Sequence, residues 1–286
     1  MSVNSKSATM NIVRRHNIKA QKKFGQNFLT DDNVLDEIVE AAGVGSSDHV
    51  IEIGPGLGTL TKRLAEKAGH VTAIEIDRQM IPVLDEVLSE YENTRVICAD
   101  VLKTDMQEIA GMYPDENVKV VANLPYYITT PIVTGLLESG VRYKSITVMV
   151  QTEVAERMQT GPGSKEYGAL SLAVQYYSKP RIIVDVPPES FYPMPGVDSS
   201  VIRLDLYEEP PVRVKDPDRM FRIIKASFMQ RRKTLSNALQ NNPDTHIPRE
   251  KTEEILESLG LDLKIRGEAL TLEQFAAFSD LVSVKP

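Results

Sequence analysis

The segment Asn123-Leu124-Pro125-Tyr126-Tyr127 brings together residue types that could activate a weakly nucleophilic amine. An exocyclic amine on an aromatic base is a poor nucleophile because its lone pair is delocalised into the ring. The side-chain oxygen of Asn123 and the carbonyl oxygen of Leu124 could accept its two N–H groups and localise that lone pair on the nitrogen. Pro125 fixes the backbone and has no competing N–H, and Tyr126 offers a face on which a base can stack. The same residues would also suit a β-turn with both tyrosines in the core.

Three glycines follow an acidic residue in the segment Glu52-Ile53-Gly54-Pro55-Gly56-Leu57-Gly58. Glycine lets a backbone approach a ligand closely because it has no Cβ. The spacing does not fit the dinucleotide fingerprint G-x-G-x-x-G/A, because the last position would fall on Thr59. The pattern predicts either a ligand-binding loop, with Gly54 and Gly56 close to the ligand, or a tight turn that binds nothing.

Two further acidic residues stand where predicted strands end. Glu75, followed by Ile76, ends the second strand and could accept hydrogen bonds from both hydroxyls of a ribose. Asp100, followed by Val101, comes after the third strand and could accept from the amino group of an adenine. A single acid in such a position is usually only solvated. Because both acids and the glycine loop follow successive strands, and ligands of open α/β sheets bind at that edge, a binding site is favoured.

The order of the predicted elements indicates how these residues are brought together. Short apolar strands are expected at 49–53, 71–76, 95–99, 118–122 and 145–150, and helices at 31–42, 59–67, 79–90 and 130–138. Strands that alternate with helices in this way predict a parallel sheet covered on both faces. Two strand-like segments at 181–184 and 201–206 have no helix between them, so they predict an antiparallel pair at the sheet edge.

A change of pattern after Pro210-Pro211 predicts a second domain. Beyond this point only helical patterns occur, at about 217–239, 251–259 and 271–282. Residues 1–20 are polar and contain few large apolar side chains, so we expect them to be loosely ordered. The sequence therefore predicts a flexible basic segment (1–20), an α/β domain (21–208) and a small all-helical domain (209–286).

The basic residues are concentrated in two parts of an otherwise acidic chain. The 286 residues include 33 basic and 40 acidic side chains, for a net charge of −7. Residues 1–30 and 219–243 each hold six basic residues and no acidic one. This segregation predicts either a basic face for nucleic acid or only a solvated tail and helix face. The residues expected to contact nucleic acid are Arg14, Arg15, Lys22, Lys23, Arg222, Lys225, Arg231, Arg232 and Lys233.

The composition excludes several classes of protein. The single cysteine, Cys98, rules out a disulfide framework and a multi-cysteine metal cluster. The four histidines form no metal-binding pair, so no metal is expected. No apolar run reaches the roughly 18 residues of a membrane span, and the N-terminus lacks the apolar core of a signal peptide. We therefore expect a cytoplasmic protein that does not associate with a membrane.

These motifs resemble those of a known family. The acid-x-Gly-x-Gly-x-Gly loop is similar to that of class I S-adenosylmethionine (SAM) methyltransferases, and residues 123–126 resemble the motif of those that modify exocyclic amino groups. From about residue 20 to about residue 281, the chain resembles the ribosomal RNA adenine N6,N6-dimethyltransferases of the small subunit. The segments that carry this resemblance are 21–29, 52–58, 123–127, 191–199 and 230–235.

The resemblance implies a fold, a cofactor and a set of site residues. The fold would be a Rossmann-like, mostly parallel methyltransferase sheet with an antiparallel edge strand, followed by the small helical domain. The cofactor would be SAM, held by Gln26, Asn27, Leu29, Gly54, Gly56, Glu75, Ile76, Asp100, Val101 and Asn123. Asn123 would also face the target amine, with Leu124, Pro125 and Tyr126 around it. Phe191 would close over the target base.

The implied substrate is small-subunit rRNA within an immature ribosomal subunit. A monomeric enzyme would transfer two methyl groups to each of two adjacent adenosines in the 3′-terminal hairpin. Two alternatives stay open. The related large-subunit adenine methyltransferases of macrolide resistance usually have Ile at the position of Leu124 and Phe at that of Tyr127. A non-catalytic RNA-binding assembly factor could share the fold, although the intact glycine loop, strand-end acids and Asn123 favour an enzyme.

Overall fold

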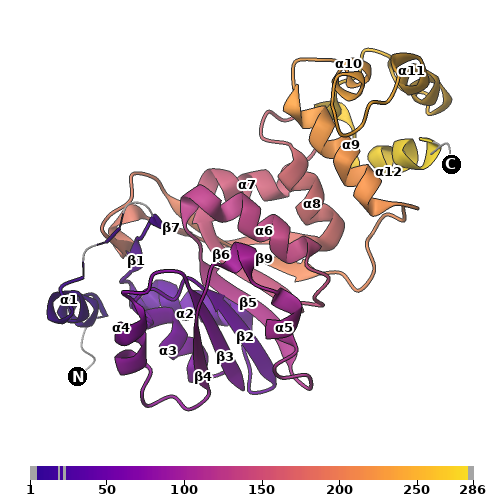
Figure 1. The fold of residues 1–286 in the computed structure, drawn as a ribbon. Helices are drawn as coiled ribbons and strands as arrows, with labels where there is room; N and C mark the ends of the chain where they lie inside the picture. The colour runs from indigo at the N-terminus through magenta and orange to yellow at the C-terminus, as the bar shows by residue number, and fades with distance from the viewer. Residues whose placement is uncertain (1–4, 19, 22–23, 283–286) are drawn as a thin grey trace. The chain divides into compact units, whose positions relative to one another are not determined.

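The computed structural model of the chain describes residues 5–18, 20–21 and 24–282, and the chain forms two compact units (Figure 1). One unit comprises Met1–Ala155 and Lys179–Leu206, and the other comprises Glu156–Ser178 and Tyr207–Pro286. The sequence analysis instead began the helical domain at residue 209 and so assigned residues 156–178 to the α/β domain. Residues 156–178 join the helical unit because Leu172 and Tyr176 are buried in the same apolar cluster as Phe221 and Phe275.

A seven-stranded sheet forms the centre of the first unit, with the strand order β4-β3-β2-β5-β6-β9-β7. The strands are β2 (Asp48–Ile53), β3 (His70–Glu75), β4 (Thr94–Cys98), β5 (Asn117–Asn123), β6 (Ser145–Gln151), β7 (Ser178–Val186) and β9 (Ser199–Leu206). The first five strands in this order are parallel, and β9 pairs with β6 in the antiparallel direction. This arrangement confirms the predicted fold class.

The strand order has a reversal point between β2 and β5. From β2 the chain crosses first to β3 and β4 on one side, and later to β5 and β6 on the other. Helices leaving the two sides of such a point diverge, so a crevice opens at the carboxyl ends of the two strands. The glycine loop follows β2 and Asn123 ends β5, so both motifs lie at this crevice.

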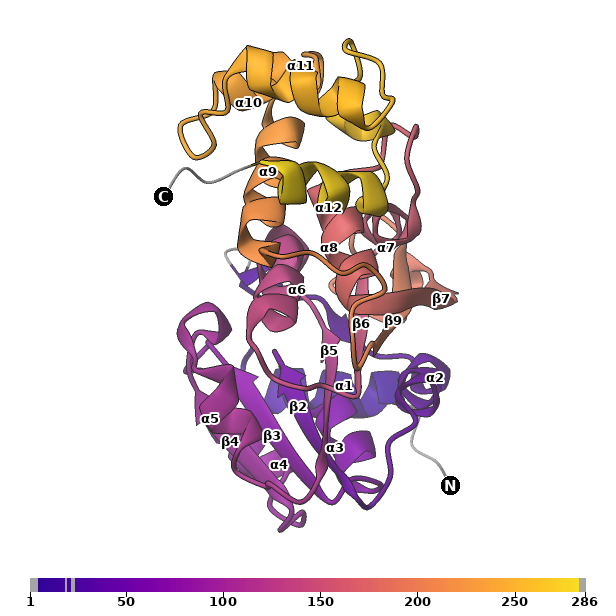
Figure 2. The ribbon, with the colours of Figure 1, turned by 90° about the vertical axis from the view of Figure 1, so that its right-hand side faces the viewer.

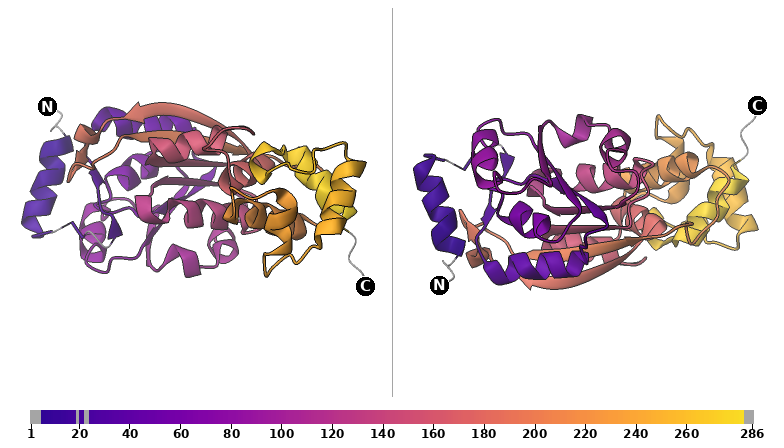
Figure 3. Two further views of the ribbon diagram at one scale, coloured as in Figure 1. Left: turned by 90° about the horizontal axis from the view of Figure 1, so that it is seen from above. Right: turned by 90° about the horizontal axis from the view of Figure 1, so that it is seen from below.

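Helices lie on both faces of the sheet, as its continuous apolar strands require (Figures 2 and 3). Those of the first unit are α1 (Ser5–Arg15), α2 (Asp32–Ala42), α3 (Thr59–Ala65), α4 (Ile81–Val87), α5 (Met106–Ala110) and α6 (Thr129–Glu138), with α7 (Thr152–Gln159) at its boundary. Helix α2 begins after a capping acid: the Asp31 side chain accepts from the Asn33 N–H, and Gly43 ends the helix at φ 56°. None of the helices described in this structure is long and apolar enough to cross a membrane.

Helix α1 corrects the expectation of a loosely ordered N-terminal segment. Val13 is buried in an apolar cluster with Leu84 of α4. Arg15 of α1 forms an ion pair with Glu86 of α4, and the His16 side chain lies 3.0 Å from the Glu86 carboxylate. The sequence here is too polar to fold alone, but Val13, with Ile12 and Ile18 partly buried against the same cluster, and these charged contacts join residues 5–18 to α4.

The second unit is helical, as predicted. It contains α8 (Ala169–Tyr177), α9 (Pro217–Met229), α10 (Leu235–Gln240), α11 (Arg249–Ser258) and α12 (Leu272–Leu281). The helix expected over 217–239 is broken, because residues 230–234 form a turn between α9 and α10. Residues 231–233 are three consecutive cations, so this stretch offers no apolar side chain to a continuous buried helix face. Arg222 therefore lies on α9, whereas Lys233 lies in the turn after it.

Candidate active site

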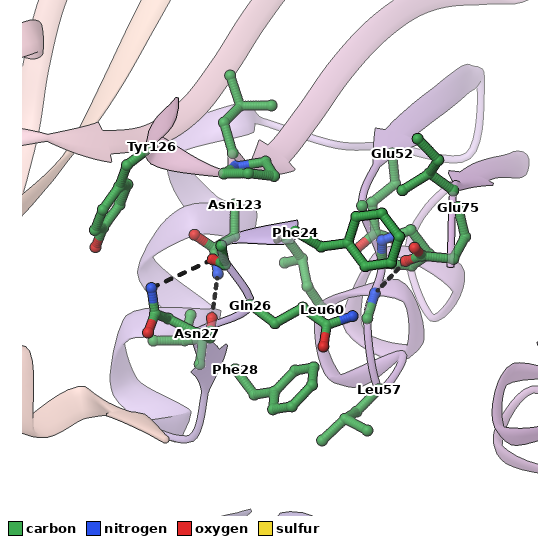
Figure 4. Close-up of a pocket in the computed structure, with 18 of the residues that line it drawn as sticks. Phe24, Gln26, Asn27, Phe28, Glu52, Leu57, Leu60, Glu75, Asn123 and Tyr126 are labelled. Carbon is green, nitrogen blue, oxygen red and sulfur yellow. Dashed lines mark hydrogen bonds between the residues drawn. The ribbon is translucent and has the colours of Figure 1, made fainter. Parts of the chain in front are cut away.

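A pocket opens at the carboxyl ends of β2 and β5 (Figure 4). Its volume is about 850 Å³, including the space at its open mouth. Four segments line it: residues 24–29 from the N-terminal part, the glycine loop after β2, the end of β3, and residues 123–128 after β5. The glycine loop and the residues after Asn123, both singled out in the sequence, therefore face the same pocket.

The glycine loop supplies a wall of bare backbone. Gly54 has φ 69°, a conformation that favours glycine, and a Cβ added there would meet nothing within 4 Å. A side chain at this position would project into open space and occupy room that a ligand could use. Gly56 has φ 55°, and a Cβ there would lie 3.2 Å from the Phe28 ring. The loop therefore tolerates no side chain at Gly56 without moving Phe28, which also lines the pocket.

Two buried carboxyl groups, Glu52 and Glu75, face this loop. Glu75 is 4% exposed; its Oε2 accepts from the Gly56 N–H at 3.2 Å and its Oε1 from the Asp77 N–H at 2.7 Å. Burial raises the pKa of Glu75. Each carboxylate oxygen has a second lone pair, so Glu75 can still accept from a ligand hydroxyl.

Glu52 is more deeply buried, at 1% exposure. Among the residues that the structure describes, its Oε2 has no hydrogen-bond partner. Burial, together with the nearby charge of Glu75, raises the pKa of the Glu52 carboxyl to about 8. A buried, unpartnered acid against a pocket suits a cationic or hydrogen-bonding group of a ligand. The sequence analysis treated Glu52 only as part of the glycine motif and did not include it among the site residues.

Asn123 is oriented by the N-terminal segment. Its side-chain Nδ2 donates to the main-chain carbonyl of Asn27 at 3.1 Å, as the dashed line in Figure 4 shows. This bond points the amide nitrogen at the segment that covers the pocket. The amide oxygen is left as an acceptor, and no donor from the described residues binds it. The oxygen is therefore available to a group in the pocket, as the proposed amine activation requires.

The residues after Asn123 are fixed by the backbone and by β9. Leu124 is buried, and its N–H donates to the Met149 carbonyl at 3.1 Å. The Tyr126 hydroxyl lies 2.6 Å from the Ser199 Oγ, and burial raises the pKa of Tyr126. Tyr127, at 56% exposure, is not a core aromatic. The alternative in which both tyrosines pack in the core is therefore wrong.

Of the other residues expected to hold the cofactor, some line the pocket and some do not. Gln26, Asn27, Leu29 and Ile76 line it. Asp100 and Val101 are not among the lining residues. The Asp100 side chain instead caps a short turn by accepting from the Leu102 N–H at 3.1 Å. Three apolar lining residues, Phe24, Leu57 and Leu60, were not singled out from the sequence, because no local pattern distinguishes a pocket wall from a core.

Phe191 lies outside the pocket lining. It belongs to β8 (Phe191–Tyr192), which pairs with β1 (Phe28–Leu29) so that Leu29 is opposite Phe191. Phe191 is 3% exposed and packs in an apolar cluster with Leu29 and Val34. Contact between Phe191 and a target base would require its side chain to leave this cluster.

The residues expected to bind nucleic acid are distributed over both units. Lys22 and Lys23 lie outside the described residues. Arg14 is exposed on α1, and Arg222 and Lys225 are exposed on α9. Arg232 and Lys233 are exposed in the turn after α9, where Arg231 also lies 3.3 Å from the Glu268 carboxylate. Within the described part of the chain, no cluster of histidine, cysteine or acidic residues could hold a metal ion.

Comparisons with known proteins show the family of the chain. The family model described as ribosomal RNA adenine dimethylase matches residues 17–282. The chain belongs to the ribosomal RNA adenine dimethylase family. This membership confirms the resemblance found in the sequence and the assignment of the chain as an enzyme.

Relatives in this family are similar over almost their whole length. Ribosomal RNA small subunit methyltransferase A of Lachnoclostridium phytofermentans is 53% identical over 282 residues, covering 97% of this chain and 96% of the relative. The protein of the same name from Bacillus licheniformis is 50% identical, covering 95% and 94%.

Two solved structures extend the comparison. A dimethyladenosine transferase from Plasmodium falciparum has a TM-score of 0.72 at 29% identity, covering 88% of this chain and 95% of that one. The 23S rRNA methyltransferase ErmE has a TM-score of 0.66 at 27% identity, covering 90% and 99%.

Proposed function

We propose that this protein transfers methyl groups from SAM to the N6 amines of two adjacent adenosines in the 3′-terminal hairpin of small-subunit rRNA. The observation that carries the proposal is one pocket in which the Asn123 amide stands across from the glycine loop and Glu75. The first group could bind an adenine amine and the second a nucleoside cofactor. The names and identities of the full-length relatives support the small subunit as the source of the RNA.

The residues of the pocket fit SAM. Gly54 leaves open space next to its backbone, where a ligand can approach without meeting a side chain. Glu75 offers a buried carboxylate to the ribose hydroxyls, and the Glu52 Oε2, which has no partner among the described residues, could accept a hydrogen bond from the amino group of SAM. Asn27 and Leu29 would form the opposite wall. Asp100, next to the end of β4, remains our proposed partner for the cofactor adenine, through whichever lone pairs its capping bond leaves free.

The chain's own residues would bind and orient the amine. When bound, SAM supplies an electrophilic sulfonium methyl group. The Asn123 oxygen and the Leu124 carbonyl would accept the two N–H groups, which favours a pyramidal nitrogen with a localised lone pair. Tyr126, anchored on Ser199, would stack on the base. Positioning and hydrogen bonding would account for most of the acceleration, and the methylated nitrogen would release its extra proton to water, so no strong general base is required.

The proposed substrate is an immature small subunit in the cytoplasm. Because the net charge is −7, phosphate contact has to be local. The exposed cations of α1, α9 and the turn at 231–233 are the proposed contacts. A large-subunit substrate is disfavoured by the much lower identity to ErmE and by Leu124 and Tyr127, where large-subunit enzymes usually have Ile and Phe.

Replacing Asn123 tests the proposed chemistry. In Asn123→Ala, the target amine would stay flat and conjugated, and losing one positioned contact of this kind typically lowers a rate by about 10²–10³-fold. The assay is single-turnover transfer of tritiated methyl groups to small subunits with saturating SAM. Subunit binding should change little, because it depends on distant cations.

Asn33→Ala, an exposed asparagine on α2, is the matched control and should methylate normally. A rate near that of the wild type in Asn123→Ala would show that the motif is only a turn. A wild-type protein that binds subunits but methylates neither subunits nor free RNA would favour the assembly factor.

A further inference from the structure

Asp77 lies two residues after Glu75 and collects hydrogen bonds from a segment about 50 residues earlier in the chain. Its side chain is buried, with the residue 4% exposed. Its Oδ2 accepts from the Gln21 Nε2 at 2.8 Å and from the Gln26 Nε2 at 2.9 Å. Its Oδ1 accepts from the Gln79 N–H at 3.1 Å. A carboxylate is an acceptor-only group, so it suits a position where three N–H groups converge.

The two glutamines also bond to each other and so close a ring. The Gln21 main-chain N–H donates to the Gln26 Oε1 at 2.8 Å. The Gln26 amide therefore uses its oxygen within the segment and its nitrogen on Asp77. In the described part of the chain, the bonds from these two side chains to the rest of the unit end on Asp77, apart from a longer contact of 3.3 Å between the Gln21 Nε2 and the Gln79 Oε1.

The segment held in this way is a wall of the pocket. Residues 24–29 line one side of it, and Phe28 lies against Gly56. The far end of the segment has other attachments, through Asn123 and through the pairing of β1 with β8. Its near end, at Gln21 and Gln26, is attached through Asp77. The Asp77 main-chain N–H also donates to the Glu75 carboxylate at 2.7 Å. The acid that holds the segment and the acid proposed to bind the ribose therefore lie in the same turn.

We propose that Asp77 is a positioning residue that fastens the N-terminal segment over the pocket and thereby slows release of the bound cofactor. The identity of that cofactor as SAM rests on the proposed function; the fastening itself does not. Hydrogen bonds to a charged group are the stronger class, and Asp77 makes two of them to this segment. Their loss should let residues 24–29 move away from the pocket without removing any group that contacts the reacting atoms.

The first measurement needs no cofactor. Hydrogen exchange at the main-chain amides of residues 24–29 should be at least about tenfold faster in Asp77→Ala than in the wild type, since those amides would be protected less often. Gln21→Ala, which leaves the buried acid in place, should show the same direction. Asp85→Ala, an exposed acid on α4, is the matched control and should leave exchange unchanged. Unchanged exchange in folded Asp77→Ala and Gln21→Ala would overturn the fastening.

The second measurement concerns SAM. Asp77→Ala should raise the dissociation rate constant and the Kd for SAM about tenfold, with kcat at saturating SAM reduced much less. Asp77→Asn keeps an oxygen that can accept from both glutamines, so its Kd should lie nearer to that of the wild type. The double variant Asp77→Ala/Gln21→Ala should be no weaker than Asp77→Ala, because both changes remove the same bond. Additive effects, or a Kd within twofold of wild type, would overturn the role in cofactor release.

If the wild type did not bind SAM, the proposed function would fail. The exchange experiment would still decide whether Asp77 holds the segment in place.

Discussion

Replacing Glu52 with glutamine should change how the stability of the protein depends on pH. The Glu52 carboxyl is buried against the pocket, and its pKa in the folded protein is about 8, against an ordinary value of 4.5. Between these two pH values the folded state keeps a proton that the unfolded state releases. Stability must therefore fall as pH rises through this window, and the loss is complete once pH passes the folded-state pKa. Glutamine has nearly the same shape and does not titrate.

The size of the effect follows from the width of the window. Each pH unit inside this window lowers the free energy of unfolding by about 1.36 kcal/mol. From pH 5.5 to pH 7.5 the ligand-free wild type should lose about 2–3 kcal/mol more of its free energy of unfolding than Glu52→Gln. For a folding unit of this size, 1 kcal/mol corresponds to roughly 2–4 °C in Tm. The difference in Tm between the two proteins should therefore change by roughly 5–10 °C over this range, in favour of the variant at the higher pH.

Scanning calorimetry of the ligand-free proteins at the two pH values measures this difference. Glu37→Gln, which removes an exposed acid on α2, controls for the loss of one carboxyl group. It should follow the wild type. The reasoning would be refuted if the Tm values of the wild type and Glu52→Gln ran parallel over the range, because Glu52 would then bind no extra proton in the folded protein.

The remaining predictions concern cofactor and RNA binding. Because Glu75 is proposed to accept ribose hydrogen bonds and also holds the Gly56 N–H, Glu75→Ala should weaken SAM affinity at least about tenfold. Isothermal titration measures this, and unchanged affinity in a folded variant would remove Glu75 from the site. Reversing the charges of Arg222 and Lys225 should weaken subunit binding and flatten its salt dependence, while SAM titration stays normal. Filter binding over a range of salt concentrations measures this dependence, with the charge of exposed Lys67 reversed as a control. A salt dependence equal to that of the wild type would show that the cations of α9 are only solvated.

The parallel part of the sheet could be predicted because its strands contain short apolar runs. The segments expected at 49–53, 71–76 and 145–150 match β2, β3 and β6 to within a residue at each end. Strands buried on both faces need continuous apolar residues, and the helices between them leave only parallel connections. The positions of the glycine loop and Asn123 at strand ends then follow from the order of elements alone, which is why the pocket could be predicted without knowing any contact.

The parts that the sequence did not predict depend on contacts between distant segments. Helix α1 is held by Val13 and Arg15 against α4, and nothing in residues 1–20 indicates that partner. Phe191 is buried because Leu29 pairs with it across two strands of two residues each, too short to produce a periodic pattern. The helix expected over 217–239 has a helical composition throughout, so only the run of cations at 231–233 marked the break.

The proposed amine site and the proposed ribose site both depend on the N-terminal segment at residues 21–29. The Asn123 amide is oriented by the Asn27 carbonyl, and the same N-terminal segment is fastened at Asp77 beside Glu75. The group proposed to activate the amine and the group proposed to hold the ribose are thus connected through one segment that carries neither of them. A change in that segment should disturb the orientation of the Asn123 oxygen as well as the cofactor wall. Because Asn27 and Asn123 are about a hundred residues apart in the sequence, this coupling depends on the fold and not on either motif alone.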